Sequence, residues 1–506
     1  MAVEFITSDQ TVPYVVNPDD EVFVVDGVDL LSSGLAAFEF SDLAMGSVYL
    51  GIAGDIYANE DILSETITGT AEVNITVAAT STILTNGDGI VLVGDSNNQV
   101  IPLIFSNAGT ITVEEAFLFA GYMGAVNFVN TGSILSYSQS SQALLESFSS
   151  DITDWNITNS GMMQTTGNQA VVEVFGATVD LFNSGDMLSG GVRAIWIRNA
   201  ASTTTIENTG NIRGELDIAG AATIENSGDI FGFLDLANFN DTVINTGNIF
   251  GSIDFGGGTN ALTNEGFISG TITGTVSVSS FVNRGTLGDD VNLGSGVGAG
   301  INEGEILGNL NLSNSSDTFI NTGEVQGDIN AGGGDDDITA GENADRINGD
   351  SGDDTLNGEG GDDELDGGAN DDTLTGGEGF DTLTGGSGAD SFVFTLANDG
   401  DLVTDFTQGE DLLVLSELLL SRDSVTLFLV GGAKDGSDSV LDHRANFGNA
   451  SSSDITIAAQ QVGNDTVLTV SSEAGLVGSE FKDLTFTITL DDIVASSMSI
   501  DDFLFV

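Results

Sequence analysis

Several ordinary residue types are scarce in this sequence, and each shortage excludes a class of structure. The chain of 506 residues has no cysteine, so it has no disulfide framework, no thiol nucleophile and no cysteine-type zinc site. Only 3 prolines accompany 68 glycines, which indicates many tight turns rather than collagen or a proline-rich linker. No apolar run of about 18 residues occurs, so no membrane-spanning helix is predicted.

Basic residues are also rare. Nine Lys and Arg residues face 77 Asp and Glu residues, for a formal net charge of −68, and residues 1–192 contain no basic side chain. Nucleic acid is excluded as a partner, because no cationic surface is available to displace counterions from phosphates. An anionic membrane surface is disfavoured for the same reason. The hydrophobic fraction of 40% is nevertheless sufficient for a buried core, so the chain is expected to fold.

The N-terminus does not look like a cleaved secretory signal. The residues that follow Met1 have neither a basic n-region nor an apolar h-region. The protein is therefore expected either to stay inside the cell or to be exported by a route that does not read the N-terminus.

One pattern, Asn-x-Gly-x-(Ile/Val/Leu/Met), recurs along the middle of the chain. Its asparagines are Asn107, Asn130, Asn159, Asn183, Asn208, Asn226, Asn245, Asn264, Asn283, Asn302 and Asn321. Five consecutive spacings are 19 residues. A fixed period near 20 predicts one small structural unit per repeat, stacked into a solenoid.

Each repeat is interpreted as one coil of three short strands. In the coil that starts at Asn245, the apolar residues Ile253 and Phe255 alternate as in a half-buried strand. Gly247 and Gly251 are expected at corners, where φ is often positive. The predicted fold is all-β, a right-handed parallel β-helix (β-solenoid) over residues 86–330. The asparagines are interpreted as a stacked ladder of side-chain amides rather than as a ligand-binding stripe.

From residue 331 the period changes to nine. Seven nonapeptides run without a gap over residues 331–393, and the two that start at Gly376 and Gly385 match Gly-Gly-x-Gly-x-Asp-x-U-x in full. This block resembles the calcium-binding nonapeptide repeats of RTX (haemolysin-type) proteins. Asn343 and Asn370 replace the fourth glycine of their repeats, and Asp350 and Glu359 replace the second glycine.

The resemblance implies a calcium-bound β-roll in which two nonapeptides form one coil, so that residues 18 apart stack. The sixth-position aspartates then form two columns. Together with backbone carbonyls of the glycine turns they offer all-oxygen cages for about five Ca²⁺ ions. The predicted metal ligands are the fourth- and sixth-position residues Gly334, Asp336, Asn343, Asp345, Gly352, Asp354, Gly361, Asp363, Asn370, Asp372, Gly379, Asp381, Gly388 and Asp390. The block holds 18 acidic residues and one basic residue, a charge density that requires neutralising cations.

The two periods are in phase. Counted from Asn321, the sixteenth position of the 19-residue coil is Asp336, the first RTX aspartate. This predicts one continuous solenoid whose coils shrink from 19 to 18 residues where calcium becomes the main stabilising partner.

The two ends of the chain lack a clean repeat. Residues 1–85 are interpreted as a cap with irregular first coils, or as a separate interaction module. Residues 394–506 are expected to form a β-rich cap. Residues 390–394 and 401–413 resemble the segment after the repeats of serralysin-type proteins. Residues 499–506, acidic and then apolar, resemble the uncleaved C-terminal signal of type I secretion substrates. The resemblance implies a type I transporter as partner and a secreted, extracellular or cell-surface location.

Few residues favour catalysis. A parallel β-helix joined to RTX repeats is also the plan of mannuronan epimerases and some polysaccharide lyases, which need a base and a cation beside a sugar carboxylate. The single histidine, His443, lies outside the repeats, and the metalloprotease motif His-Glu-x-x-His is absent. Arg193 and Arg198 flank Trp196, either as a sugar-contacting patch or as a packing contact between coils.

The sequence is therefore interpreted as that of a non-enzymatic, calcium-stabilised structural protein of a bacterial cell surface or extracellular matrix, of surface-layer, filament or adhesin type. Self-association is expected. The alternative is a secreted protein that modifies or binds a polysaccharide.

Overall fold

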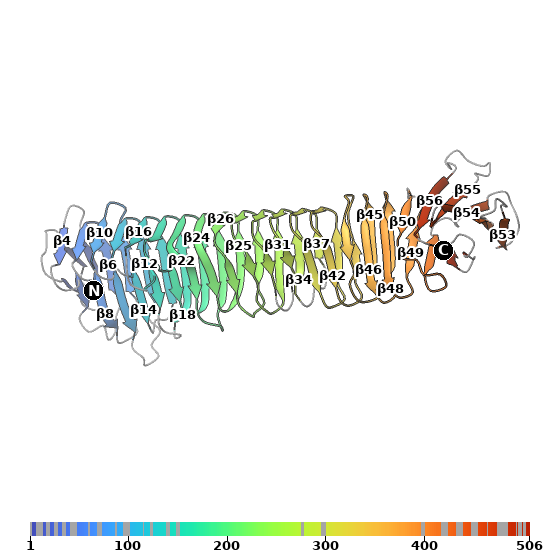
Figure 1. The fold of residues 1–506 in the computed structure, drawn as a ribbon. Helices are drawn as coiled ribbons and strands as arrows, with labels where there is room; N and C mark the ends of the chain where they lie inside the picture. The colour runs from blue at the N-terminus through green and yellow to red at the C-terminus, as the bar shows by residue number, and fades with distance from the viewer. Residues whose placement is uncertain are drawn as a thin grey trace. The chain divides into compact units, whose positions relative to one another are not determined.

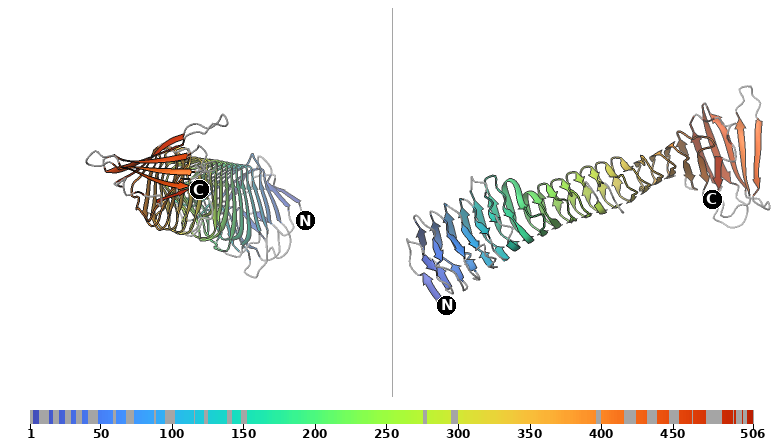
Figure 2. Two further views of the ribbon diagram at one scale, coloured as in Figure 1. Left: turned by 90° about the vertical axis from the view of Figure 1, so that its right-hand side faces the viewer. Right: turned by 90° about the horizontal axis from the view of Figure 1, so that it is seen from below.

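Figures 1 and 2 show the fold in a computed structural model. The structure describes residues 3–6, 14–16, 21–24, 29–32, 37–40, 48–58, 61–67, 73–86, 89–94, 102–114, 116–121, 125–137, 142–147, 152–274, 278–294, 300–395, 400–415, 424–431, 439–446, 454–462, 464–472, 484–491, 493, 498 and 502–505. The chain divides into two compact units, Met1–Val276 and Ser277–Val506. The described ranges contain no α-helix, and hence no helix that could cross a membrane.

The first unit consists of coils of three short strands, and the strands of successive coils pair in parallel along three faces. Figure 1 shows the stacked coils. The first face contains β1 (Val3–Ile6), β3 (Glu21–Val24), β6 (Val48–Ile52), β9 (Val73–Val77), β12 (Leu103–Asn107), β15 (Ala125–Asn130), β18 (Ile152–Asn159), β21 (Gly176–Asn183), β23 (Thr203–Asn208), β25 (Ala221–Asn226), β28 (Thr242–Asn245) and β31 (Asn260–Asn264).

The second face of this unit contains β4 (Asp29–Ser32), β7 (Asp55–Ala58), β10 (Thr82–Thr85), β13 (Thr110–Val113), β16 (Ser133–Ser136), β19 (Met162–Thr165), β22 (Asp186–Ile197), β24 (Asn211–Ile218), β26 (Asp229–Phe231), β29 (Asn248–Ile249) and β32 (Phe267–Ile268). The third contains β2 (Tyr14–Val16), β5 (Phe38–Phe40), β8 (Leu63–Ile67), β11 (Ile90–Gly94), β14 (Leu118–Gly121), β17 (Leu145–Ser147), β20 (Val172–Val174), β27 (Leu234–Leu236), β30 (Ile253–Asp254) and β33 (Ile272–Thr273). The long strands β22 and β24 contribute to both of these faces.

The described strands of residues 1–85 belong to the same three faces. Strand β9 pairs in parallel with β12, and β10 pairs in parallel with β13. The described part of this segment therefore forms coils of the solenoid, although its sequence shows no regular period.

Alternation of side chains along the strands builds the core. Ile249, Ile253 and Phe255 are fully buried, as the apolar pattern predicts. Of the apolar pair that precedes Asn245, Val243 is buried whereas Ile244 is 37% exposed. Successive strand residues point to opposite faces, so each such pair places one side chain inside the solenoid and one outside. Full burial of one Ile or Phe side chain contributes roughly 1.5–3 kcal/mol.

The repeated asparagines form the predicted ladder. Within the first unit, each Nδ2 donates a hydrogen bond of 2.7–2.8 Å to Oδ1 of the next asparagine, from Asn107 through to Asn264. In the second unit the same bonds join Asn283 to Asn302 and Asn302 to Asn321, each at 2.7 Å. Each ladder amide from Asn107 to Asn302 also donates to a nearby backbone carbonyl, as Asn245 does to Gly247 O. The ladder thus satisfies polar groups at a buried bend.

The corner glycines act differently from the prediction. Gly247 and Gly251 are not among the residues with positive φ. A Cβ at Gly247 would instead lie 2.2 Å from Gly228 O, and one at Gly251 would lie 2.1 Å from Gly232 O. The expectation of positive φ at these two corners was wrong. Glycine is needed there because successive coils approach too closely for a side chain.

The second unit changes from three faces to two. Its first face contains β34 (Val278–Asn283), β37 (Gly300–Asn302), β40 (Thr318–Asn321), β43 (Asp337–Thr339), β45 (Thr355–Gly360), β47 (Thr373–Glu378), β49 (Ser391–Phe394), β51 (Leu412–Leu415) and β57 (Phe503–Phe505). The opposite face contains β36 (Val291–Asn292), β39 (Leu310–Ser313), β42 (Ile329–Gly332), β44 (Arg346–Asn348), β46 (Glu364–Ala369), β48 (Thr382–Ser387), β50 (Asp401–Val403) and β56 (Leu484–Leu490).

A third, short face of this unit comprises β35 (Thr286–Leu287), β38 (Glu305–Ile306) and β41 (Glu324–Val325). Among the described residues, no strand of a later coil pairs with β41, so the third face ends there. From there the coils have two strands each and 18 residues, with Asp337 paired to Thr318 on one side and to Thr355 on the other. The 18-residue coils therefore stack directly on the 19-residue coils, as the shared phase predicts.

A second asparagine ladder crosses this change of coil length. Asn311, Asn330 and Asn348 each donate Nδ2 to Oδ1 of the asparagine one coil earlier, at 2.7 Å, and the first of these acceptors is Asn292. The spacings of 19, 19 and 18 residues follow the coil length. This ladder was not predicted.

The C-terminal segment is rich in antiparallel strands. Strands β52 (Ser424–Gly431), β53 (Ser439–Asn446), β54 (Asp454–Val462), β55 (Asp465–Ser472) and β56 form this part. It joins the solenoid where β56 pairs in parallel with β50 and where β57 pairs in parallel with β51. The predicted secretion segment thus includes a strand of the last coil.

Candidate metal centre

The sixth-position aspartates of the RTX repeats stand in two buried columns. In one column the backbone N–H groups of Asp336, Asp354 and Asp372 donate to Oδ1 of the aspartate 18 residues further on, at 2.8–2.9 Å. In the other, the N–H groups of Asp345 and Asp363 do the same at 2.8 and 2.9 Å. All seven of these aspartates are buried. The predicted stacking of residues 18 apart is confirmed.

Both columns extend beyond the nonapeptides. At the N-terminal side, the N–H of Asp317 donates to Asp336 Oδ1 at 2.7 Å. At the other end, Asp401 Oδ1 accepts from Asp381 N–H at 3.2 Å, and Asp411 Oδ1 accepts from Asp390 N–H at 3.0 Å. The nine-residue period does not identify Asp401 or Asp411, because they lie 20 and 21 residues after their partners. The position of Asp317 in the 19-residue coil was the one available signal.

Five of the seven sixth-position aspartates have a second carboxylate oxygen with no hydrogen-bond donor in the described part of the protein. Oδ2 of Asp336, Asp354, Asp363, Asp372 and Asp381 is buried and makes no hydrogen bond. A buried anionic oxygen without a donor is strongly unfavourable unless a proton or a cation is bound to it. These five oxygens therefore indicate a ligand that the protein itself does not supply.

Burial raises the pKa of these carboxyl groups, because it disfavours their ionised form. It raises the pKa of Asp336, Asp363 and Asp372 to about 7, against the lowering effect of the backbone N–H bond that each carboxylate accepts. It raises the pKa of Asp354 and Asp390 to about 6. Neighbouring aspartates add a smaller repulsion that acts the same way. Burial therefore destabilises the ionised form of the column aspartates, and a bound cation would stabilise it.

First-position glycines lie beside four of the five unpaired oxygens, those of Asp354, Asp363, Asp372 and Asp381, whereas the repeat of Asp336 has Ala331 at this position. A Cβ at Gly349 would lie 2.4 Å from Asp354 Oδ2 and 2.5 Å from Gly367 O, and a Cβ at Gly358 would lie 2.2 Å from Asp363 Oδ2. Carboxylate and carbonyl oxygens thus line the same small space, from which any side chain is excluded. These glycines were absent from the predicted ligand set.

The predicted fourth-position residues shape the turns through their backbone. Five of them are glycines with φ between 109° and 155°, and Asn370 has φ of 86°. Asn343 does not share this conformation, and its Nδ2 donates to Gly323 O. Asp350 and Glu359 have φ of 66° and 67°, so both turns form although glycine is missing there. Both residues adopt a left-handed backbone conformation, which is strained for a residue with a side chain.

The donor set fits calcium. Within the described ranges, no group of three or more acidic, histidine or cysteine side chains converges on one point. A cation would therefore be held by column carboxylates together with backbone carbonyls of the glycine turns. This is a set of hard oxygen ligands without nitrogen or sulfur, as Ca²⁺ prefers. The bound ion supplies positive charge that lets the aspartates remain ionised inside the coil.

The arginine and tryptophan patch is already internally paired. The guanidinium groups of Arg193 and Arg198 lie 4.3 and 4.5 Å from the ring centroid of Trp196. Arg193 pairs with Asp217 at 2.7 Å, and Arg198 pairs with Glu173 at 2.6 Å. These contacts favour packing between coils over sugar recognition. His443 lies in β53, whose side chains are outside the description.

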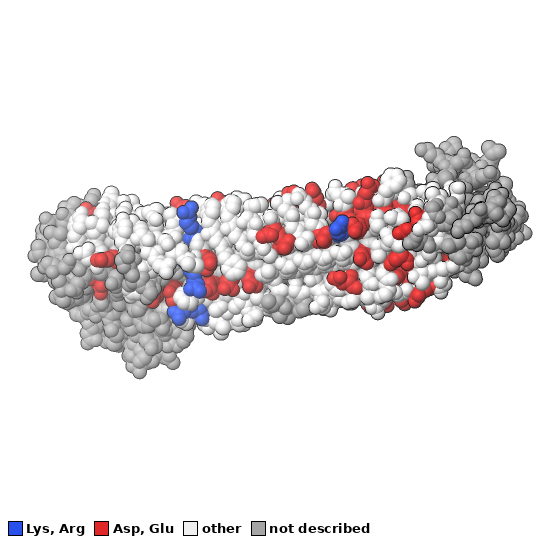
Figure 3. Space-filling view, in the orientation of Figure 1, with Lys and Arg blue, Asp and Glu red and all other residues white. Residues whose placement is uncertain are grey.

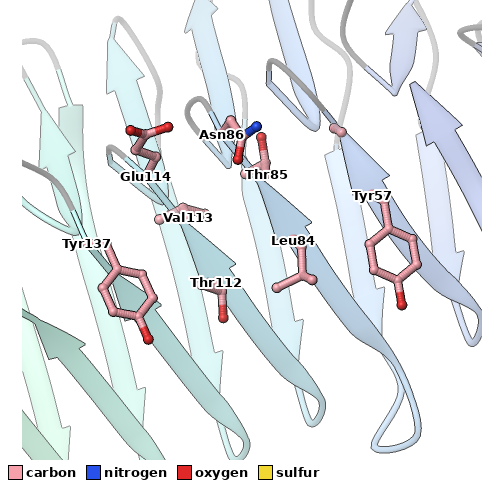
Figure 4. A pocket seen from close by; sticks show the side chains of 9 residues that line it. Tyr57, Leu84, Thr85, Asn86, Thr112, Val113, Glu114 and Tyr137 are labelled. Carbon is pink, nitrogen blue, oxygen red and sulfur yellow. The ribbon is translucent and has the colours of Figure 1, made fainter. Parts of the chain in front are cut away.

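A groove of about 560 Å³ opens on the second face of the first unit (Figure 4). Leu84 pairs with Tyr57 on one side and with Thr112 on the other. In Figure 4 the rings of Tyr57 and Tyr137 lie on either side of Leu84 and Thr112. Tyr137 is 51% exposed. The groove combines aromatic rings with the polar groups of neighbouring strands and has no basic side chain.

Residues 330–365 and residues 366–400 each match the family model of the RTX calcium-binding nonapeptide repeat, a model that spans four copies of the repeat. No curated protein matches the chain, and no solved structure matches it. The matched residues carry the columns of stacked aspartates and the glycine turns described above. The chain is therefore a β-solenoid protein with RTX calcium-binding repeats.

Proposed function

We propose that this chain is a secreted structural protein of a bacterial cell surface or extracellular matrix, which calcium folds after export. The observation that carries the proposal is the set of buried column carboxylates whose Oδ2 atoms have no donor. Extracellular calcium modules bind at about 10⁻⁴–10⁻³ M. The columns would therefore stay empty at cytosolic calcium and fill outside the cell, where about five ions would offset roughly ten negative charges. The role requires no catalysis.

Export through a type I transporter is the second part of the proposal. RTX repeats are typical of proteins secreted by this route, and the acidic and apolar C-terminus supports it. Because Phe503–Phe505 forms the last strand of the solenoid, deleting the terminal residues would damage both a signal and the fold. A fusion is therefore the sharper experiment.

We expect a passenger protein fused to residues 394–506 to leave cells that carry a type I transporter, because the signal is read at the C-terminus. The passenger alone and a fusion to residues 331–393 serve as controls and should stay inside. The measurement is the fraction of passenger in the medium. Retention of the 394–506 fusion, or export of the 331–393 fusion, would contradict the assignment.

Self-association is the third part of the proposal, with a second copy of the chain as the partner. Phe231 and Phe250 stack at a centroid distance of 4.8 Å and are 37% and 41% exposed. The ring of Phe267 lies beside this stack, tilted by 59° at a centroid distance of 6.0 Å from Phe250. An exposed stack of aromatic rings is typical of an interaction surface. Acidic side chains gather over the RTX strands (Figure 3), so association would need calcium to reduce repulsion.

Light scattering after size exclusion is expected to show assemblies in millimolar calcium and monomers in a chelator. In the double variant Phe231→Ser, Phe250→Ser, the concentration for half-association should rise about tenfold or more, since a loss of 1.4 kcal/mol is tenfold. Phe182→Ser is the matched control, because Phe182 is similarly exposed, at 38%, and lies outside the stack. A monomer at high calcium and high protein concentration would refute the assembly.

The tyrosine groove supports a second candidate function, the binding of a neutral polysaccharide. Exposed aromatic rings can stack on sugar rings, and the absence of basic side chains disfavours an acidic polymer. The protein samples prepared for light scattering in calcium also distinguish self-association from polysaccharide binding. A protein that stays monomeric in calcium and is retained on a neutral glucan resin, with weaker retention of Tyr137→Ala, would favour the binding function.

A further inference from the structure

One buried carboxylate outside the RTX repeats has the same unpaired oxygen as the RTX columns. Asp241 precedes β28 in the first unit and is 1% exposed. Its Oδ1 accepts the N–H of Ala222 at 2.7 Å, as the RTX aspartates do from the preceding coil. Its Oδ2 is buried and has no hydrogen-bond partner.

The next coil places an amide where Asp241 has a carboxylate. Asn260 lies 19 residues further on, and its Oδ1 accepts the N–H of Asp241 at 2.9 Å. Its Nδ2 lies 3.5 Å from both Phe255 O and Gly257 O, toward which it donates. This side of the turn therefore presents backbone carbonyl oxygens. At Asp241, a carboxylate oxygen takes the place of the amide donor.

A third coil satisfies the same carboxylate with hydroxyl and amide donors. Oδ2 of Asp317 accepts from the N–H and from the Oγ–H of Ser313, at 3.0 and 2.7 Å. The residue four positions before Asp241 is Ala237, which has no side-chain donor. The N–H of Ala237 is already bonded to Ile218 O at 3.1 Å. Ala237 therefore cannot supply to Asp241 Oδ2 the two hydrogen bonds that Ser313 donates to Asp317 Oδ2.

The turn that follows Asp241 by one coil shares with an RTX turn two glycines of positive φ at the same positions. Gly256 and Gly258 have φ of 57° and 104°, four and two residues before Asn260. Gly332 and Gly334 have φ of 104° and 109° at the same two positions before Asp336. A Cβ at Gly258 would lie 1.8 Å from Phe239 O, so the turns 237–241 and 256–260 meet backbone to backbone.

We propose that a calcium ion binds between the turns 237–241 and 256–260, held by the Asp241 carboxylate and by backbone carbonyl oxygens. All ligands are hard oxygens, which selects Ca²⁺ over metals that prefer nitrogen or sulfur. With one carboxylate, the site binds more weakly than an RTX cage. The competing explanation is a proton on Asp241, whose pKa burial raises to about 6.

Amide hydrogen exchange of the full-length protein tests the site locally, with Ca²⁺ alone as the probe. We expect peptides that cover residues 237–260 to exchange about tenfold more slowly at a free calcium concentration about tenfold above Kd, at pH 7.5. In Asp241→Asn this calcium response is lost, because the new amide donates to the carbonyls as Asn260 does. The matched control is Glu225→Gln, which removes an equal charge from an exposed position on the neighbouring strand β25 and should keep the response.

Three outcomes would overturn the site. One is an unchanged exchange rate for 237–260 in wild type while residues 331–393 gain protection, a result that leaves the RTX proposal intact. Another is a calcium response that persists in Asp241→Asn. The third is protection of 237–260 by acidification to about pH 5 without calcium, corrected for the intrinsic exchange rate, with no effect of calcium at pH 7.5; that result would assign a proton to Asp241.

Discussion

At about pH 7.5, above the raised pKa of the column aspartates, removal of calcium is expected to unfold the RTX coils over residues 331–393 and to leave the first unit folded. Without calcium, five buried Oδ2 atoms have neither donor nor counter-charge, and the columns repel themselves. At a free calcium concentration about tenfold above Kd, each ion contributes about 1.4 kcal/mol, so five ions contribute about 7 kcal/mol. That amount is comparable to the whole stability of a typical domain. Circular dichroism should show a large loss of β signal in a chelator, and hydrogen exchange should place the loss within 331–393.

A pair of adjacent variants sharpens this prediction. Asp363 is buried in a column, whereas Asp362 is exposed, with Oδ1 accepting only the N–H of Phe380. Asp363→Asn should raise the calcium concentration needed for folding several-fold, and Asp362→Asn should change it little, although both remove one negative charge. Equal effects of the two variants, or a spectrum that calcium does not change, would contradict the assignment of the columns as the calcium site.

The calcium-free protein is expected to be most stable in mild acid, opposite to the usual behaviour of salt-bridged carboxylates. Burial raises the folded-state pKa of Asp336, Asp363 and Asp372 to about 7, above the usual value of 3.8. Between these values the folded chain binds more protons than the unfolded chain, so the free energy of unfolding falls as pH rises. The stabilisation is fully present below about pH 4 and is lost as pH rises through about 6 to 7.

Thermal unfolding of protein depleted of calcium on a chelating resin should therefore show a melting temperature for the RTX coils that falls between about pH 4 and pH 7. Calcium should bind more tightly as pH rises over this interval and should release protons in an unbuffered titration, since it competes with them for the same oxygens. The coils that precede residue 220 serve as an internal control. A melting temperature that rises with pH in the absence of calcium would show that the buried aspartates are not the titrating groups.

Much of this architecture is readable from periodicity. The 19-residue spacing of asparagines such as Asn226 and Asn245 predicts the amide ladder, because identical side chains one coil apart must lie next to each other. The nine-residue spacing predicts the two columns for the same reason, and the shared phase of Asn321 and Asp336 predicts the direct stacking of 18-residue coils on 19-residue coils. Each of these inferences needs only the length of a coil.

Features that depend on atoms from different coils required the tertiary structure. Asp401 and Asp411 enter the columns off the period, because the chain between them and their partners has a different length from a coil. The corner glycine Gly247 is required by a carbonyl one coil away, which no local backbone preference shows.

The same limit applies to the fate of a single buried carboxylate. Asp317 and Asp241 occupy the same position of the repeat, and this position alone predicts that both lie at a turn before a strand. The folded structure shows that Ser313 donates to Asp317 Oδ2, whereas Asp241 Oδ2 has no donor. The physical reason is that a hydrogen bond depends on distances of a few tenths of an ångström between atoms, whereas a repeat specifies only which residues are neighbours.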